Sequence, residues 1–288
     1  MRPFAYYEPR TLDEAVALLG QADGPASVLA GGTDLLVEIK EGLRRVDHVV
    51  NIKRIPDLTG LRYDDTDGLR FGALTTTREI ETSPLVRAHY PNLAQAVSAL
   101  GSVQVRNRAT VAGNICRASP SADTPPPLIA DGASVRLVGP SGERTLPLED
   151  FFVGPGKTVL GQGELVVEFS VPAPPPHTGQ VYLKHGRRAA MELATVGVAV
   201  TLTLADGVCC AARVVLGAVA PIPLRARQAE AVLRGRVVDE GVVEAAAEAA
   251  MAEARPISDV RASADYRREM VRVLTARATR RALALARA

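Results

Sequence analysis

The stretch from Ala109 to Asp123, with the sequence ATVAGNICRASPSAD, decides the fold together with a second stretch, Val28 to Leu36, with the sequence VLAGGTDLL. Each places small residues and a hydroxyl group at a point where an apolar segment turns back into the fold. Turns of this composition let backbone N–H groups approach a phosphate closely. Two of them predict a pair of clamps on one ligand that contains a diphosphate.

In the earlier turn, we expect the amides of Gly31 and Gly32 and the hydroxyl of Thr33 to face the diphosphate. Asp34 would repel a phosphate, so its carboxylate is assigned to the N-terminus of the following helix, where a negative charge is favourable. Taken alone, this turn is also typical of a strand-to-helix connection that binds nothing.

In the later turn, Thr110 and Asn114 offer side-chain hydrogen bonds, and Gly113 permits close approach. A tight turn without a ligand is again the alternative. Asp123 precedes the segment TPPP, which is rigid and would hold the carboxylate in place. That carboxylate could accept hydrogen bonds from ribose or ribityl hydroxyls, and the alternative is a helix cap or a surface salt bridge.

Composition excludes several classes of protein. The 288 residues are 47% hydrophobic and 23% charged, with a net charge of +2, which gives no strong attraction to nucleic acid or membranes. No apolar run is long enough to span a membrane, and the N-terminus lacks the apolar core of a signal peptide, so a cytoplasmic protein is expected.

The three cysteines, Cys116, Cys209 and Cys210, do not have metal-ligand spacing, and the adjacent pair is expected inside a strand. Redox chemistry would need an organic cofactor or a partner.

The pattern along the chain predicts an α+β protein with two regions. Capping boxes at Thr11 and Thr76 open helices, and helical spacing continues over 34–40 and 92–100. Strands are expected over 27–30, 48–52, 69–74, 133–138 and 164–171, and the segment 103–123 reads as a long ordered loop. A proline-rich linker at 172–176 predicts a domain boundary, after which strands over 197–204 and 208–216 flank an Asp-Gly hairpin turn and helices follow.

Three other motifs are weak. The segment Gly156-Lys-Thr resembles the end of a P-loop, but Phe151 stands where that motif needs glycine. Gly31 and Gly32 do not belong to a Gly-x-Gly-x-x-Gly fingerprint, so a Rossmann site is not supported. The arginine-rich segment 255–288 has helical spacing without interleaved aromatic residues, and an exposed helix face explains it better than a nucleic-acid arm.

Taken together, these pieces resemble the FAD-binding medium subunit of molybdenum hydroxylases, the xanthine dehydrogenase and carbon monoxide dehydrogenase family. The resemblance covers essentially the whole chain. Its motifs are an N-terminal Phe-x-Tyr-x-x-Pro, Leu-x-Glu-Ala-x-x-Leu-Leu, Ala30–Leu36, Asn51-Ile, Gly72–Thr76, Gly101–Asn107, Thr110–Asp123, Phe151–Thr158, Gly217–Pro221 with Pro223 and Arg225, and Ala-x-Tyr-Arg-Arg around Tyr266.

The resemblance implies an FAD-binding domain of the vanillyl-alcohol-oxidase-like (PCMH) type over 1–174, divided into subdomains of about 1–57 and 58–174, and a small α+β domain over 175–288. It implies that FAD is held by two clamps, by residues that line its channel or contact its ribose or ribityl chain, and by residues near the flavin ring. These are Leu29, Ala30, Gly31, Gly32, Thr33, Asp34, Leu35 and Leu36; Thr110, Val111, Ala112, Gly113 and Asn114; Leu100, Gly101, Val105 and Asp123; and Val166 and Lys184.

Two positions depart from the family pattern. Ala112 stands where glycine is common, which would loosen the approach of that backbone segment. Glu192 replaces a usual Asp, which puts a local hydrogen bond after the Lys184 loop in doubt. We further expect Lys184 to place positive charge near the reduced flavin and so to raise its reduction potential.

By the resemblance, the chain is an electron-transfer subunit without catalytic or metal-ligating residues of its own. It would take electrons from a small subunit with [2Fe–2S] clusters, beside a large molybdopterin-binding subunit, in a heterotrimer that dimerises. A small-molecule acceptor such as NAD, oxygen or a quinone would receive them. The alternatives are a free-standing flavin oxidoreductase of the same fold, an assembly module that has lost its flavin, and a nucleic-acid-binding role for the basic C-terminal segment. The sequence does not indicate the hydroxylated substrate or the physiological acceptor.

Overall fold

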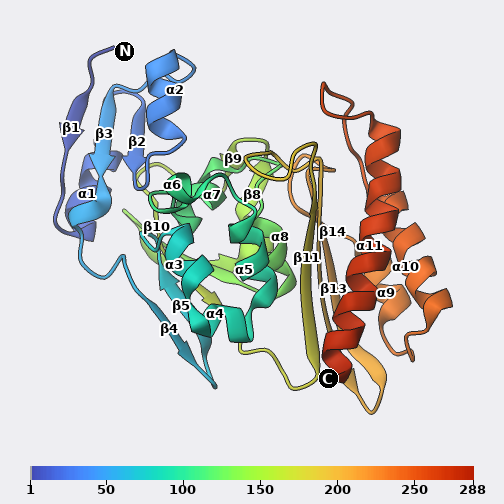
Figure 1. Ribbon diagram of the computed structural model, residues 1–288. Coiled ribbons are helices and arrows are strands. Elements are labelled where there is room, and N and C mark those ends of the chain that lie inside the picture. The colour runs from blue at the N-terminus through green and yellow to red at the C-terminus, as the bar shows by residue number, and fades with distance from the viewer. Residues whose placement is uncertain (1) are drawn as a thin grey trace.

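The N-terminal part of the chain is a small parallel sheet with two helices. The computed structural model describes residues 2–288. Its first sheet has the order β1-β3-β2, formed by β1 (Ala5–Tyr7), β2 (Ala26–Leu29) and β3 (His48–Asn51). The connections are α1 (Leu12–Gly20) and α2 (Leu35–Glu41), and the short helix η1 (Ile52–Arg54) follows β3 (Figure 1). Thr11 caps α1 by accepting the Glu14 N–H, as the capping box predicts.

A five-stranded antiparallel sheet forms the middle of the molecule. Its order is β4-β5-β10-β6-β7, with β4 (Leu61–Asp64), β5 (Gly68–Gly72), β6 (Ser134–Gly139), β7 (Gly142–Pro147) and β10 (Leu165–Val171). The helices α3 (Thr77–Thr82), α4 (Pro84–His89), α5 (Pro91–Ser98) and α8 (Pro125–Ala130) contribute to the same core, and η2 (Leu148–Phe151), β8 (Phe152–Gly154) and β9 (Lys157–Thr158) complete the region. Phe71 and Phe169 stack in the core on adjacent strands, with ring centroids 5.2 Å apart.

The expectation of a long ordered loop over 103–123 is wrong. The structure has two short helices there, α6 (Val103–Arg106) and α7 (Val111–Arg117). The hydroxyl groups of Ser102 and Thr110 cap these helices. Ser102 accepts a hydrogen bond from the Val105 N–H, and Thr110 accepts one from the Gly113 N–H. Both helices are too short to produce a clear hydrophobic period, so their caps were the only local signal.

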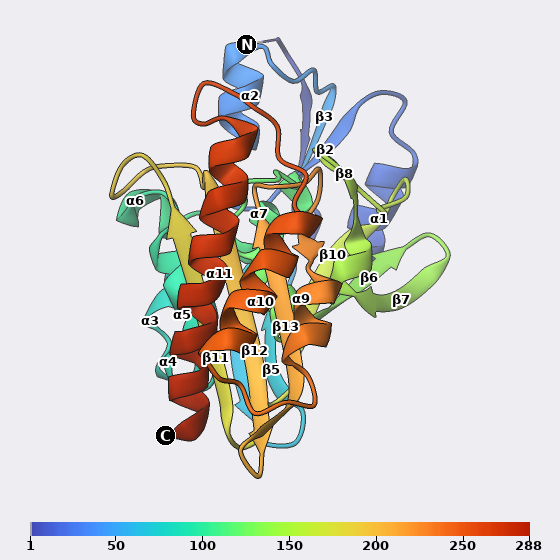
Figure 2. The ribbon, with the colours of Figure 1, turned by 90° about the vertical axis from the view of Figure 1, so that its right-hand side faces the viewer.

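The C-terminal part is an antiparallel sheet with helices on one face. Its order is β11-β12-β13-β14, with β11 (Thr178–His185), β12 (Val196–Ala205), β13 (Val208–Gly217) and β14 (Leu224–Arg225). The helices α9 (Arg227–Leu233), α10 (Glu240–Glu253) and α11 (Ala264–Arg287) cover one face (Figure 2). The hairpin turn is confirmed, since Asp206 and Gly207 both have positive φ angles, 51° and 78°. The mixed helix-and-sheet class expected from the sequence is therefore confirmed.

The structure also shows where the adjacent cysteines and the arginine-rich C-terminal segment lie. Cys209 is buried in β13, but its neighbour Cys210 is exposed, because successive side chains of a strand point to opposite faces. All the arginines of the C-terminal segment except Arg255 and Arg261 lie on α11, where Arg272 and Arg280 form ion pairs with glutamates of α10. Within the described residues 2–288, no helix has the length and apolar character needed to cross a membrane.

The other face of the C-terminal sheet packs on α5 and α8 of the middle region. Polar contacts join the two sides. Asp131, after α8, accepts hydrogen bonds from Asn92 on α5 and from Thr201 on β12, at 2.6–3.0 Å. Arg213 on β13 donates to the Ile129 carbonyl at 3.1 Å. These contacts bury the Asp131 carboxyl group between the C-terminal sheet and the helices α5 and α8.

Replacement of Asp131 by asparagine is expected to flatten the pH dependence of stability. Burial raises the pKa of Asp131 to about 7, whereas the pKa of an aspartate in the unfolded chain is about 3.9. Between these values the native state binds more protons, so the free energy of unfolding falls as pH rises, by up to about 1.4 kcal/mol per pH unit. Urea unfolding of wild type and Asp131→Asn over this interval measures the difference. Asp150→Asn, at an exposed position, is the control, and parallel profiles for Asp131→Asn and wild type would contradict the prediction.

Candidate cofactor site

Both glycine turns open onto one cavity of about 940 Å³. It runs between the N-terminal sheet and the middle region, and its wall also includes residues of the segments 156–166 and 191–193. A cavity of this size is in the range of sites that bind large organic ligands. Within residues 2–288, no group of three or more His, Cys, Asp or Glu side chains is placed to hold a metal ion.

The two turns lie in direct contact at Gly31. A Cβ atom added to Gly31 would stand 2.2 Å from the Arg108 carbonyl oxygen and 2.9 Å from the Ala109 Cα. Both are backbone atoms that cannot rotate away. Gly31 therefore permits the two turns to pack together, and this role differs from the close ligand approach that the sequence suggested.

The first turn presents a row of free backbone donors. Among the hydrogen bonds of residues 2–288, none uses the N–H groups from Gly31 to Leu35, and the first N–H bonded after the turn is that of Leu36, to the Gly32 carbonyl. Gly32 has a φ of 74°, which turns the backbone into this arrangement. Consecutive unpaired N–H groups in such a turn form a concavity for an anion. Asp34 precedes α2 as expected, but its carboxylate makes no capping hydrogen bond.

The second turn is organised by its own side chains. The Thr110 hydroxyl oxygen accepts the Gly113 N–H at 3.0 Å, and the Asn114 side-chain oxygen accepts the Thr124 hydroxyl at 2.6 Å. A Cβ added to Gly113 would meet only the Thr110 oxygen, at 3.0 Å. Gly113 therefore leaves the wall of the cavity open beside the capped start of α7.

Asp123 connects the cavity to the C-terminal sheet. Its carboxylate accepts hydrogen bonds from the Tyr182 hydroxyl and from the Lys184 ammonium group, both at 2.8 Å. Lys184 also donates to the Ala99 carbonyl at 3.0 Å. Burial raises the pKa of Asp123, and the charge and hydrogen bonds of Lys184 and Tyr182 act against that rise. The same burial, with the Asp123 charge, raises the pKa of Tyr182 well above its usual range.

Most of the residues predicted from the sequence line the one cavity. They are Ala30, Gly31, Gly32, Thr33, Asp34, Leu35, Leu100, Gly101, Val105, Thr110, Ala112, Gly113, Asn114, Asp123 and Val166. Four do not: Leu29 and Val111 are core residues, Leu36 points outward on α2, and Lys184 stands behind Asp123. Glu192, the departure noted after the Lys184 loop, pairs with Arg188 at 2.9 Å.

Sequence reasoning missed several residues of the wall. Arg44, Arg117, Ser119, Thr158 and Met191 all line the cavity. The false P-loop at Gly156 was a usable signal for Thr158. No local pattern marks Arg44 or Arg117, which reach the cavity from the loop after α2 and from the last turn of α7.

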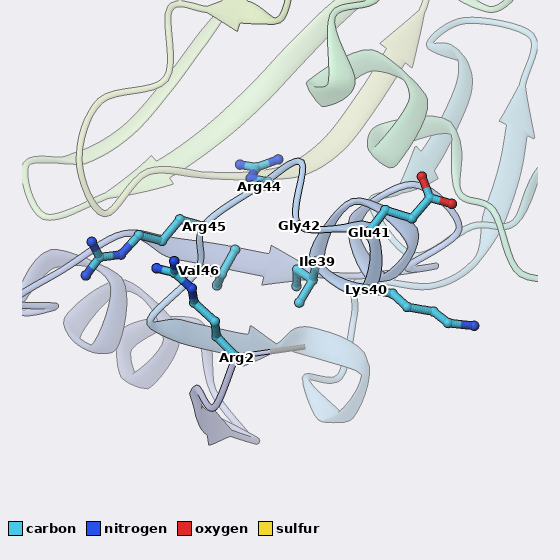
Figure 3. Close-up of a pocket in the computed structure, with 8 residues that line it drawn as sticks. All are labelled: Arg2, Ile39, Lys40, Glu41, Gly42, Arg44, Arg45 and Val46. Atoms are coloured by element: carbon cyan, nitrogen blue, oxygen red, sulfur yellow. The ribbon is translucent and has the colours of Figure 1, made fainter.

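A second, smaller cavity of about 430 Å³ lies on the far side of α2. Figure 3 shows Arg2 and Arg45 on one side of it, with Lys40 and Glu41 pointing away from them and Arg44 directed elsewhere. Arg45 is already paired with Asp47 at 3.3 Å. The side chains that line this smaller cavity do not converge on one point. Of its lining residues, only Arg44 also lines the large cavity.

Comparison with known proteins shows which family has this fold and this cavity. Residues 2–174 match the family model described as the FAD binding domain in molybdopterin dehydrogenase, and residues 181–282 match the CO dehydrogenase flavoprotein C-terminal domain. The carbon monoxide dehydrogenase medium chain of Hydrogenophaga pseudoflava is 38% identical over 96% of this chain and 95% of its own length. A putative xanthine dehydrogenase FAD-binding subunit of Escherichia coli is 33% identical over 98% of this chain and 97% of its own length.

Solved structures agree with these matches. The structure of carbon monoxide dehydrogenase from Hydrogenophaga pseudoflava that lacks the Mo-pyranopterin moiety has a TM-score of 0.95, with 40% identity and 99% of both chains covered. Quinoline 2-oxidoreductase from Pseudomonas putida 86 has a TM-score of 0.91 and 30% identity, covering 99% of this chain and 98% of the other.

The fold and the cavity define a flavoprotein of the two-domain type expected from the sequence. More particularly, the chain belongs to the family of FAD-binding medium subunits of molybdenum hydroxylases, which includes those of carbon monoxide and xanthine dehydrogenases. It is an oxidoreductase subunit, and its cofactor is FAD.

Proposed function

We propose that this chain carries electrons within a molybdenum hydroxylase complex, from a [2Fe–2S] subunit to a small-molecule acceptor such as NAD, oxygen or a quinone. The row of free N–H groups from Gly31 to Leu35 supports this best, because it offers donors to a diphosphate in a cavity large enough for FAD. The relatives named as medium chains of multi-subunit dehydrogenases support the presence of partners. We infer a heterotrimer with a large molybdopterin-binding subunit and a small [2Fe–2S] subunit, which dimerises.

The residues present fit FAD. The first turn would hold the diphosphate through its amides, and the open wall at Gly113 would let the second turn approach it. When bound, the flavin supplies reversible electron transfer. The chain itself would position the ring between its two regions, and Asp123 would keep one buried carboxylate at the cavity wall for a ribose or ribityl hydroxyl.

The domain division follows the same proposal. The FAD-binding domain would span 1–174, with subdomains of about 1–57 and 58–174, and the C-terminal domain would span 175–288. Packing clusters support it, because Val198, Val200 and Leu202 on one face of β12 share a core with α10 and α11. The opposite face of the same sheet contributes Ala199 and Val215 to the core of the middle region, which is where the two domains would meet.

The direct test is the cofactor content of the purified chain. We expect a flavin absorption spectrum, and FAD released at close to one equivalent upon denaturation. The chain expressed with its neighbouring large and small subunits should form a complex in which a substrate of the large subunit bleaches that spectrum. FAD in the isolated chain without bleaching in a complete complex would favour a free-standing flavin oxidoreductase. A colourless protein, alone and in the complex, would contradict the proposal.

A further inference from the structure

Two arginines are the cationic side chains of the cavity wall. Among the described residues 2–288, Arg44 and Arg117 alone bring a guanidinium or ammonium group to it. The free amides carry only partial charge, whereas the diphosphate of FAD carries full negative charge. The wall therefore offers full positive charge at one place, between the loop after α2 and the end of α7.

A single carboxylate holds both arginines. Arg117 Nη2 lies 2.6 Å from Glu38 Oε1, and Arg44 Nη1 lies 3.6 Å from Glu38 Oε2. Glu38 is largely buried, with 16% of its side chain exposed, while the two arginines remain about half exposed. Two guanidinium groups share one carboxylate, so this cluster keeps a net positive charge facing the cavity.

The position of Arg117 links it to both clamps. It belongs to α7, the helix that begins at the second turn, and Glu38 belongs to α2, the helix that follows the first. On the opposite wall, a Cβ added to Gly156 would stand 3.7 Å from Arg117 Nη1. The guanidinium group therefore lies among the helix that follows the first clamp, the last residue of the helix that follows the second, and the segment around Gly156.

The other acidic side chains of the cavity wall do not neutralise the positive charge of Arg44 and Arg117. Asp123 is paired with Lys184, Glu164 with Arg144, and Glu192 with Arg188. Asp34 has no partner, but it is exposed, and water screens its charge.

We propose that Arg117, oriented by Glu38, binds the diphosphate of FAD, and that Arg44 adds charge beside it. This inference rests on the proposed function. A planar guanidinium group can donate two parallel hydrogen bonds to phosphate oxygens, which makes arginine more selective for phosphate than lysine. Arg117 would then select FAD over flavins that lack the diphosphate.

Titration of the full-length apoprotein tests the proposal. We expect Arg117→Met to bind FAD about 10- to 100-fold more weakly, as for the loss of a charged hydrogen bond of about 1.5–3 kcal/mol. Its affinity for riboflavin, which has no phosphate, should stay at the wild-type value. Arg117→Lys should recover part of the loss, and added salt should weaken FAD binding more in wild type than in Arg117→Met. Arg136→Met, which removes an arginine of similar exposure paired on the middle sheet, is the control.

Each other outcome is informative. Unchanged FAD affinity in Arg117→Met would overturn the inference while leaving the proposed function intact. Equal losses for FAD and riboflavin would assign Arg117 a structural role. Unchanged affinity with a shifted midpoint potential of the flavin would place Arg117 beside the ring instead of the diphosphate. A wild-type chain that takes up no FAD would overturn the proposed function itself.

Discussion

Replacement of Gly31 by alanine is expected to abolish retention of FAD. The new methyl group would stand 2.2 Å from the Arg108 carbonyl oxygen, so the two glycine turns must move apart. Overpacking of this kind costs about 1–3 kcal/mol, and the displaced amides would no longer converge on one diphosphate. We expect FAD affinity to fall by at least about a hundredfold. The measurement is the FAD content of the purified variant, followed by titration of its apoprotein.

Two further variants make this result specific. Gly154→Ala changes a glycine whose added Cβ meets only the Lys157 side chain, at 4.0 Å, and should retain FAD. Gly113→Ala keeps the turns in contact and places its methyl group at the open cavity wall, so it should fold normally and bind FAD more weakly. Wild-type FAD content in Gly31→Ala would show that contact between the turns does not matter for the site.

Replacement of Lys184 by methionine is expected to destabilise the protein by about 3–5 kcal/mol, because it leaves the buried Asp123 carboxylate without its charged partner. The side chains of Lys184 and Asp123 are only 12% and 7% exposed, so water cannot replace the lost ammonium group. The double variant Lys184→Met with Asp123→Asn should recover most of the loss. Urea unfolding of the three proteins measures these differences, and the exposed Lys157→Met is the matched control.

The same variants test the expected influence of Lys184 on the flavin. Asp123 balances the charge of Lys184 at 2.8 Å, so the ring senses a neutral pair. Removing the lysine alone would leave a negative charge and lower the midpoint potential, while the double variant should return it towards the wild-type value. A single variant with wild-type stability and potential would show that the pair supports neither the fold nor the cofactor.

Local patterns predicted much of this molecule and missed specific parts of it. The glycine turns at Gly31-Gly32 and Gly113 could be read from the sequence because clustered small residues have few uses outside tight turns and close contacts, and Gly32 has the positive φ angle, 74°, that such turns favour. The Asp206-Gly207 hairpin was predictable for the same reason. The helices α6 and α7 were missed because four and seven residues are too few to show a hydrophobic period.

The long-range contacts could not be read from any local pattern. Arg117 and Glu38 meet only because α2 and α7 lie on either side of one cavity, and neither helix marks its partner in the sequence. The contact between Gly31 and Arg108 is of the same kind. The family resemblance indicated that Asp123 and Lys184 lie near the cofactor, but it did not show that they pair with each other.

The Asp123–Lys184 pair also sets an order of events during synthesis. Lys184 follows Asp123 by 61 residues, so a ribosome adding about 5–20 residues per second delivers the lysine roughly 3–12 s after the aspartate. Until then the nascent cofactor-binding half carries the Asp123 carboxylate without its cationic partner and with no C-terminal sheet against it. A stably closed holoprotein can therefore form only after translation has passed β11, and a chain truncated before that strand should be a substrate for quality-control proteases.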